Sequence, residues 1–213
     1  MTLLEAIQTG DVILNVSEQE YLDKYAAEHY EWVGGVAYKM SPTMYRHFLL
    51  LAYLLDLLRA YFLVRPIGLV VGDSFLLKMD TLPDRPHREP DLVVLLNENR
   101  SLLHDTFIQD RADLVIEIVS PDRAERDYGK KFQEYEAASI TEYWIVDSLR
   151  KECRFLRLNS EGRYQSQFAD GDGNYRTPIL PQLILHVPTL WQESLPNMIE
   201  VLADVRKMLG VED

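Results

Sequence analysis

The sequence DLVIEIV at residues 113–119 decides the fold, together with DLVVLL at residues 91–96. Both runs are almost continuously apolar, which is typical of strands buried on both faces of a sheet. EYWIVD at residues 142–147 has the same character and predicts a third buried strand. Between DLVIEIV and EYWIVD, residues 122–139 show the apolar spacing of a helix. This order predicts an α/β fold with a mixed sheet.

The sequence on either side of these strands supplies helices and shorter strands. Ser17 with Glu20 marks the start of a short helix, and the long helix carries apolar residues at i, i+3 and i+4. We expect helices at residues 17–28, 43–63 and 195–209, a hairpin at 30–40 that turns at Gly34 and Gly35, and strands at 69–77, 151–158, 163–168 and 182–187. The apolar stripe of the long helix consists of Leu50, Tyr53, Leu54, Leu57, Leu58 and Tyr61.

The composition excludes several classes of protein. Among 213 residues, 22 are Lys or Arg and 34 are Asp or Glu, which gives a net charge of −12. That charge opposes sequence-blind binding to nucleic acid or anionic membranes, although a local basic groove or a metal site is compatible with it. Cys153 is the single cysteine, so no internal disulfide is expected. The N-terminus has no signal-peptide pattern, and Asp56 and Arg59 interrupt the apolar run. We therefore expect a cytoplasmic protein that does not bind a membrane.

Two carboxylates stand where buried strands rarely carry charge. Asp91 opens one apolar run, and Glu117 lies inside another. A lone buried carboxylate costs several kcal/mol, so it must be paired, protonated or bound to a metal. Asp91 is otherwise explained as a turn cap, and Glu117 as a solvent-facing edge residue or an arginine partner. At one end of a sheet, the two carboxylates would suit Mg²⁺ or Mn²⁺.

A set of motifs in this order resembles a known family. The motifs are Glu89-Pro90-Asp91, DLVIEIV at 113–119 followed by Ser120-Pro121, then Asp127, Lys131, Tyr135 and EYWIVD at 142–147. Tyr30-Glu31, Gly34 or Gly35, Met40-Ser41-Pro42 and His47 resemble the N-terminal block of the same family. The family is the Uma-two family of restriction endonuclease-like proteins, within the PD-(D/E)XK nuclease superfamily.

The resemblance implies a fold and an activity. It implies a single domain with a restriction-endonuclease-like mixed β-sheet core flanked by helices. The nuclease-like part would span residues 17–190, after an N-terminal extension at 1–16, and a C-terminal helix at 191–213 would pack on the same domain. The implied activity is Mg²⁺-dependent hydrolysis of phosphodiester bonds in DNA.

The resemblance also assigns the metal ligands. Asp91 would be the aspartate of the PD element, and Glu117 the acidic residue of the (D/E)XK element. The backbone carbonyl of Ile118 would complete the protein ligands of Mg²⁺, with Mn²⁺ as a possible substitute. Such an ion polarises a phosphoryl oxygen and lowers the pKa of bound water.

The lysine of the (D/E)XK element is missing, because Val119 stands at its expected position. Lys131 is the candidate replacement, since Asp127, Lys131 and Tyr135 are spaced four apart and share one helical face. Asp127 and Tyr135 would support it. An exposed Asp127–Lys131 pair, stabilising by only ~0.3–0.5 kcal/mol, is the structural alternative. Lys130 is the replacement if the register differs by one residue.

Two N-terminal residues match further family positions. Glu31 would be an outer metal ligand, or else an ordinary exposed charge on a strand. His47 would contact a phosphate or hold a catalytic carboxylate, or else be a structural histidine. A phosphate-facing basic rim, or else a solvated surface, is expected from Arg85, Arg88, Arg123, Arg126, Lys130 and Lys131.

These observations lead to a DNA endonuclease that uses Asp91, Glu117 and Lys131, supported by Glu31 and His47. A homodimer is expected if both strands of a duplex are cut. The main alternative is a catalytically degenerate nuclease fold that acts as a binding or scaffold module, which Val119 and the acidic charge favour. A phosphatase acting on a small phosphorylated molecule is a third hypothesis, because one fold hosts different functions.

Overall fold

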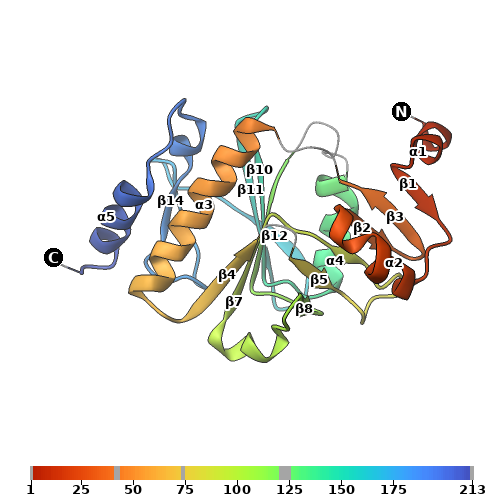
Figure 1. The fold of residues 1–213 in the computed structure, drawn as a ribbon. Helices are drawn as coiled ribbons and strands as arrows, with labels where there is room; N and C mark the ends of the chain where they lie inside the picture. The colour runs from red at the N-terminus through yellow and green to blue at the C-terminus, as the bar shows by residue number, and fades with distance from the viewer. Residues whose placement is uncertain (1, 41–43, 73–74, 120–125, 212–213) are drawn as a thin grey trace.

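The computed structural model describes residues 2–40, 44–72, 75–119 and 126–211, apart from the side chains of Leu3, Arg126 and Asp127. Figure 1 shows a central sheet seen nearly edge-on, with helices α3 (Tyr45–Val64) and α5 (Met198–Met208) on one side. Helix α4 (Lys131–Ala137) and the N-terminal elements lie on the other side. The predicted mixed α/β fold with flanking helices is confirmed.

The central sheet contains the three apolar runs that the sequence singled out. Its order is β12-β11-β10-β9-β7-β4, with bounds Tyr164–Gln167, Glu152–Leu158, Glu142–Asp147, Leu114–Ile118, Leu92–Leu96 and Gly68–Gly72. Strands β9 and β10 are parallel, while β7 runs antiparallel to β9. The carboxyl ends of β9 and β10 therefore lie at the same edge of the sheet as the start of β7.

A second six-stranded sheet is built from the N-terminal half of the chain. Its order is β1-β3-β2-β6-β5-β8, with bounds Val12–Leu14, Val36–Lys39, Tyr30–Val33, His87–Arg88, Leu76–Lys78 and Phe107–Gln109. The predicted hairpin forms β2 and β3, and the first sixteen residues contain α1 (Leu3–Thr9) and β1, which pairs with β3. A separate two-stranded sheet joins β13 (Asn174–Arg176) to β14 (Ile184–His186).

The prediction of a single strand at residues 69–77 is wrong. Strand β4 pairs with β7 in the central sheet, whereas β5 pairs with β6 and β8 in the second sheet. An apolar run has the same composition whichever sheet its residues join, so the pattern did not reveal the switch. Gly72 ends β4 where a Cβ atom would lie 2.6 Å from the carbonyl oxygen of Asp91. Only glycine allows this close approach.

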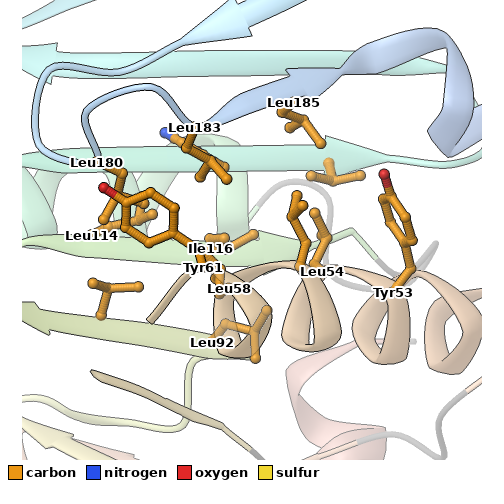
Figure 2. Packing of buried hydrophobic residues seen from close by; sticks show 14 of the residues in the cluster. Tyr53, Leu54, Leu58, Tyr61, Leu92, Leu114, Ile116, Leu180, Leu183 and Leu185 are labelled. Carbon is orange, nitrogen blue, oxygen red and sulfur yellow. The ribbon is translucent and has the colours of Figure 1, made fainter. Parts of the chain in front are cut away.

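Helix α3 forms the core on one face of the central sheet. All six residues of its predicted stripe are buried. Figure 2 shows Leu54, Leu58 and Tyr61 of α3 beside strand residues such as Leu114 and Ile116. By length and composition α3 could cross a membrane. Eight of its residues are buried inside the protein, however, and this packing accounts for its apolar character.

The remaining helices follow the predicted pattern with shifted ends. Ser17 accepts a hydrogen bond from the backbone N–H of Glu20 and caps α2 (Glu18–Lys24). The helix expected at 122–139 is a π-helical turn at Arg126–Lys130 followed by α4, and the last helix is α5. Short 3₁₀ turns occupy Ala26–Glu28, Asn97–Leu102 and Val187–Trp191. Helix α5 adds Val201 and Val205 to the core beneath α3.

Candidate active site

Asp91 and Glu117 meet at one end of the central sheet. Leu92 of β7 pairs with Ile116 of β9 in antiparallel register, so the next positions outward are Asp91 and Glu117. The backbone N–H of Ile118 donates to Oδ2 of Asp91 at 2.6 Å. The structure thus brings together the three residues expected to bind a metal. The role of the Ile118 carbonyl stays a prediction.

His47 holds the carboxylate of Asp91 from the opposite side. It lies in the first turn of α3, and its Nε2 is 2.9 Å from Oδ1 of Asp91. The side chain of His47 is 13% exposed and that of Asp91 is 19% exposed, so this pair reaches solvent. Each carboxylate oxygen has two lone pairs, and one contact on each oxygen leaves room for a cation.

Glu117 is buried and receives two donors from α4. Its Oε1 accepts from Nζ of Lys131 at 2.8 Å and from the hydroxyl of Tyr135 at 2.7 Å. Burial, reinforced by the charge of Glu117, raises the pKa of Tyr135 well above its usual value. The tyrosine therefore remains a neutral donor. Lys131 and Tyr135 share a helical face, as their spacing predicted.

Lys131 is enclosed rather than exposed. Its side chain is 1% exposed, and its Nζ lies 3.4 Å from Oε1 of Glu31 in addition to the contact with Glu117. The alternative of a solvent-exposed pair therefore does not hold for Lys131, and the side chain of Asp127 lies outside the described residues. Lys130 is exposed. Of the two lysines, Lys131 is the one that reaches Glu117.

Arg88 completes the network, and the sequence analysis missed this role. Its Nη1 donates to Glu31 at 3.0 Å, while Nε and Nη2 form a bidentate pair with Glu134 at 2.7 and 2.8 Å. Burial alone would lower the pKa of Arg88, but Glu31 and Glu134 outweigh it and raise this pKa above its usual value. Glu134 follows Lys131 by three residues on α4, a spacing that puts both side chains near one helical face. This spacing is the signal in the sequence that could have indicated that Glu134 belongs to the network.

The prediction of a phosphate-facing basic rim is wrong for Arg88 and Lys131. Arg88 and Lys131 are both 1% exposed, because each is held between buried or half-buried carboxylates. Glu31 is likewise fully buried, so it is not an ordinary exposed strand charge. The side chains of Arg123 and Arg126 lie outside the described part of the chain.

The carboxylates of the site offer the oxygen ligands that a divalent cation binds. Among the described residues, Glu31, Glu117 and Glu134 form ion pairs with Arg88 and Lys131, and Asp91 adds a further carboxylate. The available ligand atoms at Asp91 and Glu117 are carboxylate oxygens. Hard oxygen donors are the ligands that Mg²⁺ and Mn²⁺ prefer. The residues present therefore fit a divalent ion.

A second group with metal-ligand chemistry lies in the other sheet. Atoms of Glu18, Asp80 and His87 lie within 4.8 Å of one another. Lys78 is 3.1 Å from Glu18, and Arg85 is 2.9 Å from Glu18 and 3.0 Å from Asp80. Burial, with the charge of Lys78, lowers the pKa of His87. Lys78 and Arg85 thus balance the charges of Glu18 and Asp80. The group is therefore an ion-pair cluster between α2 and the second sheet.

We expect Arg88→Met to destabilise the protein by roughly 3–5 kcal/mol, because it leaves Glu31 and Glu134 without their buried cation. Urea unfolding followed by circular dichroism measures this change. Arg163→Met is the matched control, since Arg163 pairs with Glu136 on the surface with its side chain 72% exposed. This control should change stability by less than about 1 kcal/mol. Equal effects of both substitutions would contradict the role given to Arg88.

Comparisons with known proteins concern the family and the fold of the chain. The family model Uma2, described as "Putative restriction endonuclease", matches residues 18–188. The crystal structure of "a putative nuclease belonging to DUF820" from Anabaena variabilis ATCC 29413 superposes with a TM-score of 0.66 at 17% sequence identity, covering 81% of this chain and 96% of that one. At this identity the likeness concerns the fold. No curated protein matches the chain. Because the family model spans most of its length, the chain belongs to the Uma2 family of putative restriction endonucleases.

Proposed function

We propose that the protein is a Mg²⁺-dependent endonuclease that hydrolyses phosphodiester bonds in DNA at the site around Asp91 and Glu117. One observation carries the proposal: these two carboxylates lie on adjacent strands at one sheet edge, and Lys131 reaches Glu117 at 2.8 Å. Membership of a nuclease family supports the same conclusion. A cytoplasmic homodimer is part of the proposal, because cutting both strands of a duplex calls for two sites.

Asp91 and Glu117 would hold the ion, with the carbonyl of Ile118 as a third ligand. When bound, Mg²⁺ supplies a Lewis acid for the phosphoryl oxygen and lowers the pKa of a water molecule at the site. Mn²⁺ would substitute, since it prefers the same oxygen ligands. His47 orients the carboxylate of Asp91, and Tyr135 orients that of Glu117.

Lys131 would supply the positive charge that comes from a strand lysine in the (D/E)XK element, where this chain has Val119. Val119 is buried in the apolar cluster between the central sheet and α4, so its position belongs to the core. Lys131 brings an ammonium group to Glu117 from the helix instead. A fixed cation beside the site stabilises negative charge that develops on the phosphate. Glu31 would act through Lys131, because it contacts the ammonium at 3.4 Å and is itself held by Arg88.

A catalytically degenerate scaffold is the second candidate. Lys131 and Tyr135 both donate to the same oxygen of Glu117, so protein groups already stabilise this carboxylate. The net charge of −12 also opposes non-specific DNA binding. This candidate and the endonuclease differ in whether the two carboxylates bind a divalent ion.

Calorimetric titration of Mn²⁺ and Mg²⁺ separates the two candidates. We expect saturable binding by the wild type and its loss in Asp91→Asn/Glu117→Gln, because that variant lacks both charged ligands. Glu18→Gln/Asp80→Asn is the matched control, since it removes two carboxylates from the ion-pair cluster, and it should retain binding. Loss of binding in the control alone would place the metal in the other sheet and contradict the proposal.

We also expect Lys131→Met to reduce the rate of DNA cleavage by about 10²–10³-fold, the usual cost of losing one group that stabilises developing charge. Metal binding should persist in this variant, because both carboxylates remain. Lys130→Met is the control, since Lys130 is the exposed neighbour, and it should cleave at nearly the wild-type rate. Loss of activity in Lys130→Met with retention in Lys131→Met would show that the other lysine serves the site.

A further inference from the structure

A row of residues across the central sheet leads from the candidate site to an exposed arginine. Glu117 of β9 pairs with Ile145 of β10, and Ile145 pairs with Arg154 of β11. Residues paired in this way point to the same face of a sheet, and neighbouring strands are about 4.8 Å apart. Arg154 therefore lies roughly 10 Å from Glu117, measured between backbones across two strand spacings, on the face that α4 covers.

An aromatic ring holds this arginine together with a second one. The guanidinium of Arg154 lies 4.5 Å from the centre of the Tyr128 ring, and that of Arg150 lies 5.4 Å from it. Tyr128 belongs to the π-helical turn and precedes Lys131 by three residues. The Tyr128 hydroxyl donates to Oδ2 of Asp147 at 3.1 Å, which fixes the ring at the end of β10.

The two arginines keep donors for a ligand. Their side chains are 58% and 50% exposed for Arg150 and Arg154. Arg154 donates to Glu152 through Nε, and Nη1 of Arg150 lies 3.8 Å from Asp147. The terminal nitrogens of Arg154 have no hydrogen-bond partner in the described part of the chain. A guanidinium over a ring keeps N–H donors at its edge, and that edge matches the geometry of a phosphate.

We propose that Arg150 and Arg154, which lie over the ring of Tyr128, bind a phosphate of the substrate strand that neighbours the phosphate cut at Asp91 and Glu117. This inference rests on the proposed endonuclease function. A chain with a net charge of −12 gains no general attraction for DNA, so binding needs positive charge at defined places. Arg88 and Lys131 do not provide it for a neighbouring phosphate, because both are buried and held by carboxylates at the site. The exposed pair on Tyr128 lies along the sheet from the site, on the same face as Glu117.

Binding of a fluorescein-labelled DNA duplex of random sequence, followed by fluorescence anisotropy with Ca²⁺ in place of Mg²⁺, tests this proposal. We expect Arg150→Ala/Arg154→Ala to bind about tenfold or more weakly, as for a lost charge-assisted hydrogen bond. The slope of log affinity against log salt should fall by about 1, the value for one phosphate contact. Glu152→Gln removes the competing carboxylate of Arg154 and should tighten binding.

Arg163→Ala is the control, because it removes another exposed arginine, beyond the other end of β11, and should leave DNA binding unchanged. Calorimetric Mn²⁺ binding and thermal unfolding of the double variant should match the wild type, which separates the effect from misfolding and from the metal site. Wild-type affinity and salt slope in the double variant would overturn the inference alone. A wild type that binds no DNA under any salt condition would overturn the inference and the endonuclease function together.

Discussion

The buried ammonium of Lys131, held between Glu117 and Glu31, is the interaction on which the site depends. An unpaired charge in a protein interior costs several kcal/mol, so each charged group in the network requires the next. Glu31 brings in Arg88, and Arg88 brings in Glu134. The chain of contacts joins β9 and α4 to β2 and β6 of the second sheet. This requirement explains why the N-terminal sheet docks beside α4 at the carboxylate end of the central sheet.

In this network two residues share the roles that a single lysine at position 119 would have, which are occupying that strand position and supplying the positive charge. Val119 fills the core, while Lys131 carries the charge from a helix. Buried ion pairs often add little to net stability compared with apolar packing, and their use is better explained by fixing geometry. In the proposed function, that geometry holds Glu117 against Asp91 at the edge of the sheet. Arg154, which lies over the ring of Tyr128 together with Arg150, is on the same face of the sheet as Glu117.

Local patterns predicted much of this molecule, and distant pairings account for what they missed. The buried strands and the stripe of α3 were predicted because their spacing is visible within a few residues. Asp91 and Glu117 stood out as charges within apolar runs. The burial of Arg88 was missed, because its partners Glu31 and Glu134 lie 57 and 46 residues away. The split of residues 69–77 between two sheets was missed for a similar reason, since only the strand partners distinguish β4 from β5.

We propose that Asp91 and Glu117 at the sheet edge form a metal site in which Lys131 holds the carboxylate of Glu117. Anomalous X-ray diffraction from crystals soaked in Mn²⁺ tests it most directly, because it locates the ion without assuming any substrate. We expect one strong anomalous peak within coordination distance of Asp91 and Glu117, with Lys131 still in contact with Glu117. A peak at Glu18, Asp80 and His87 instead, or no peak at the sheet edge under saturating Mn²⁺, would contradict it.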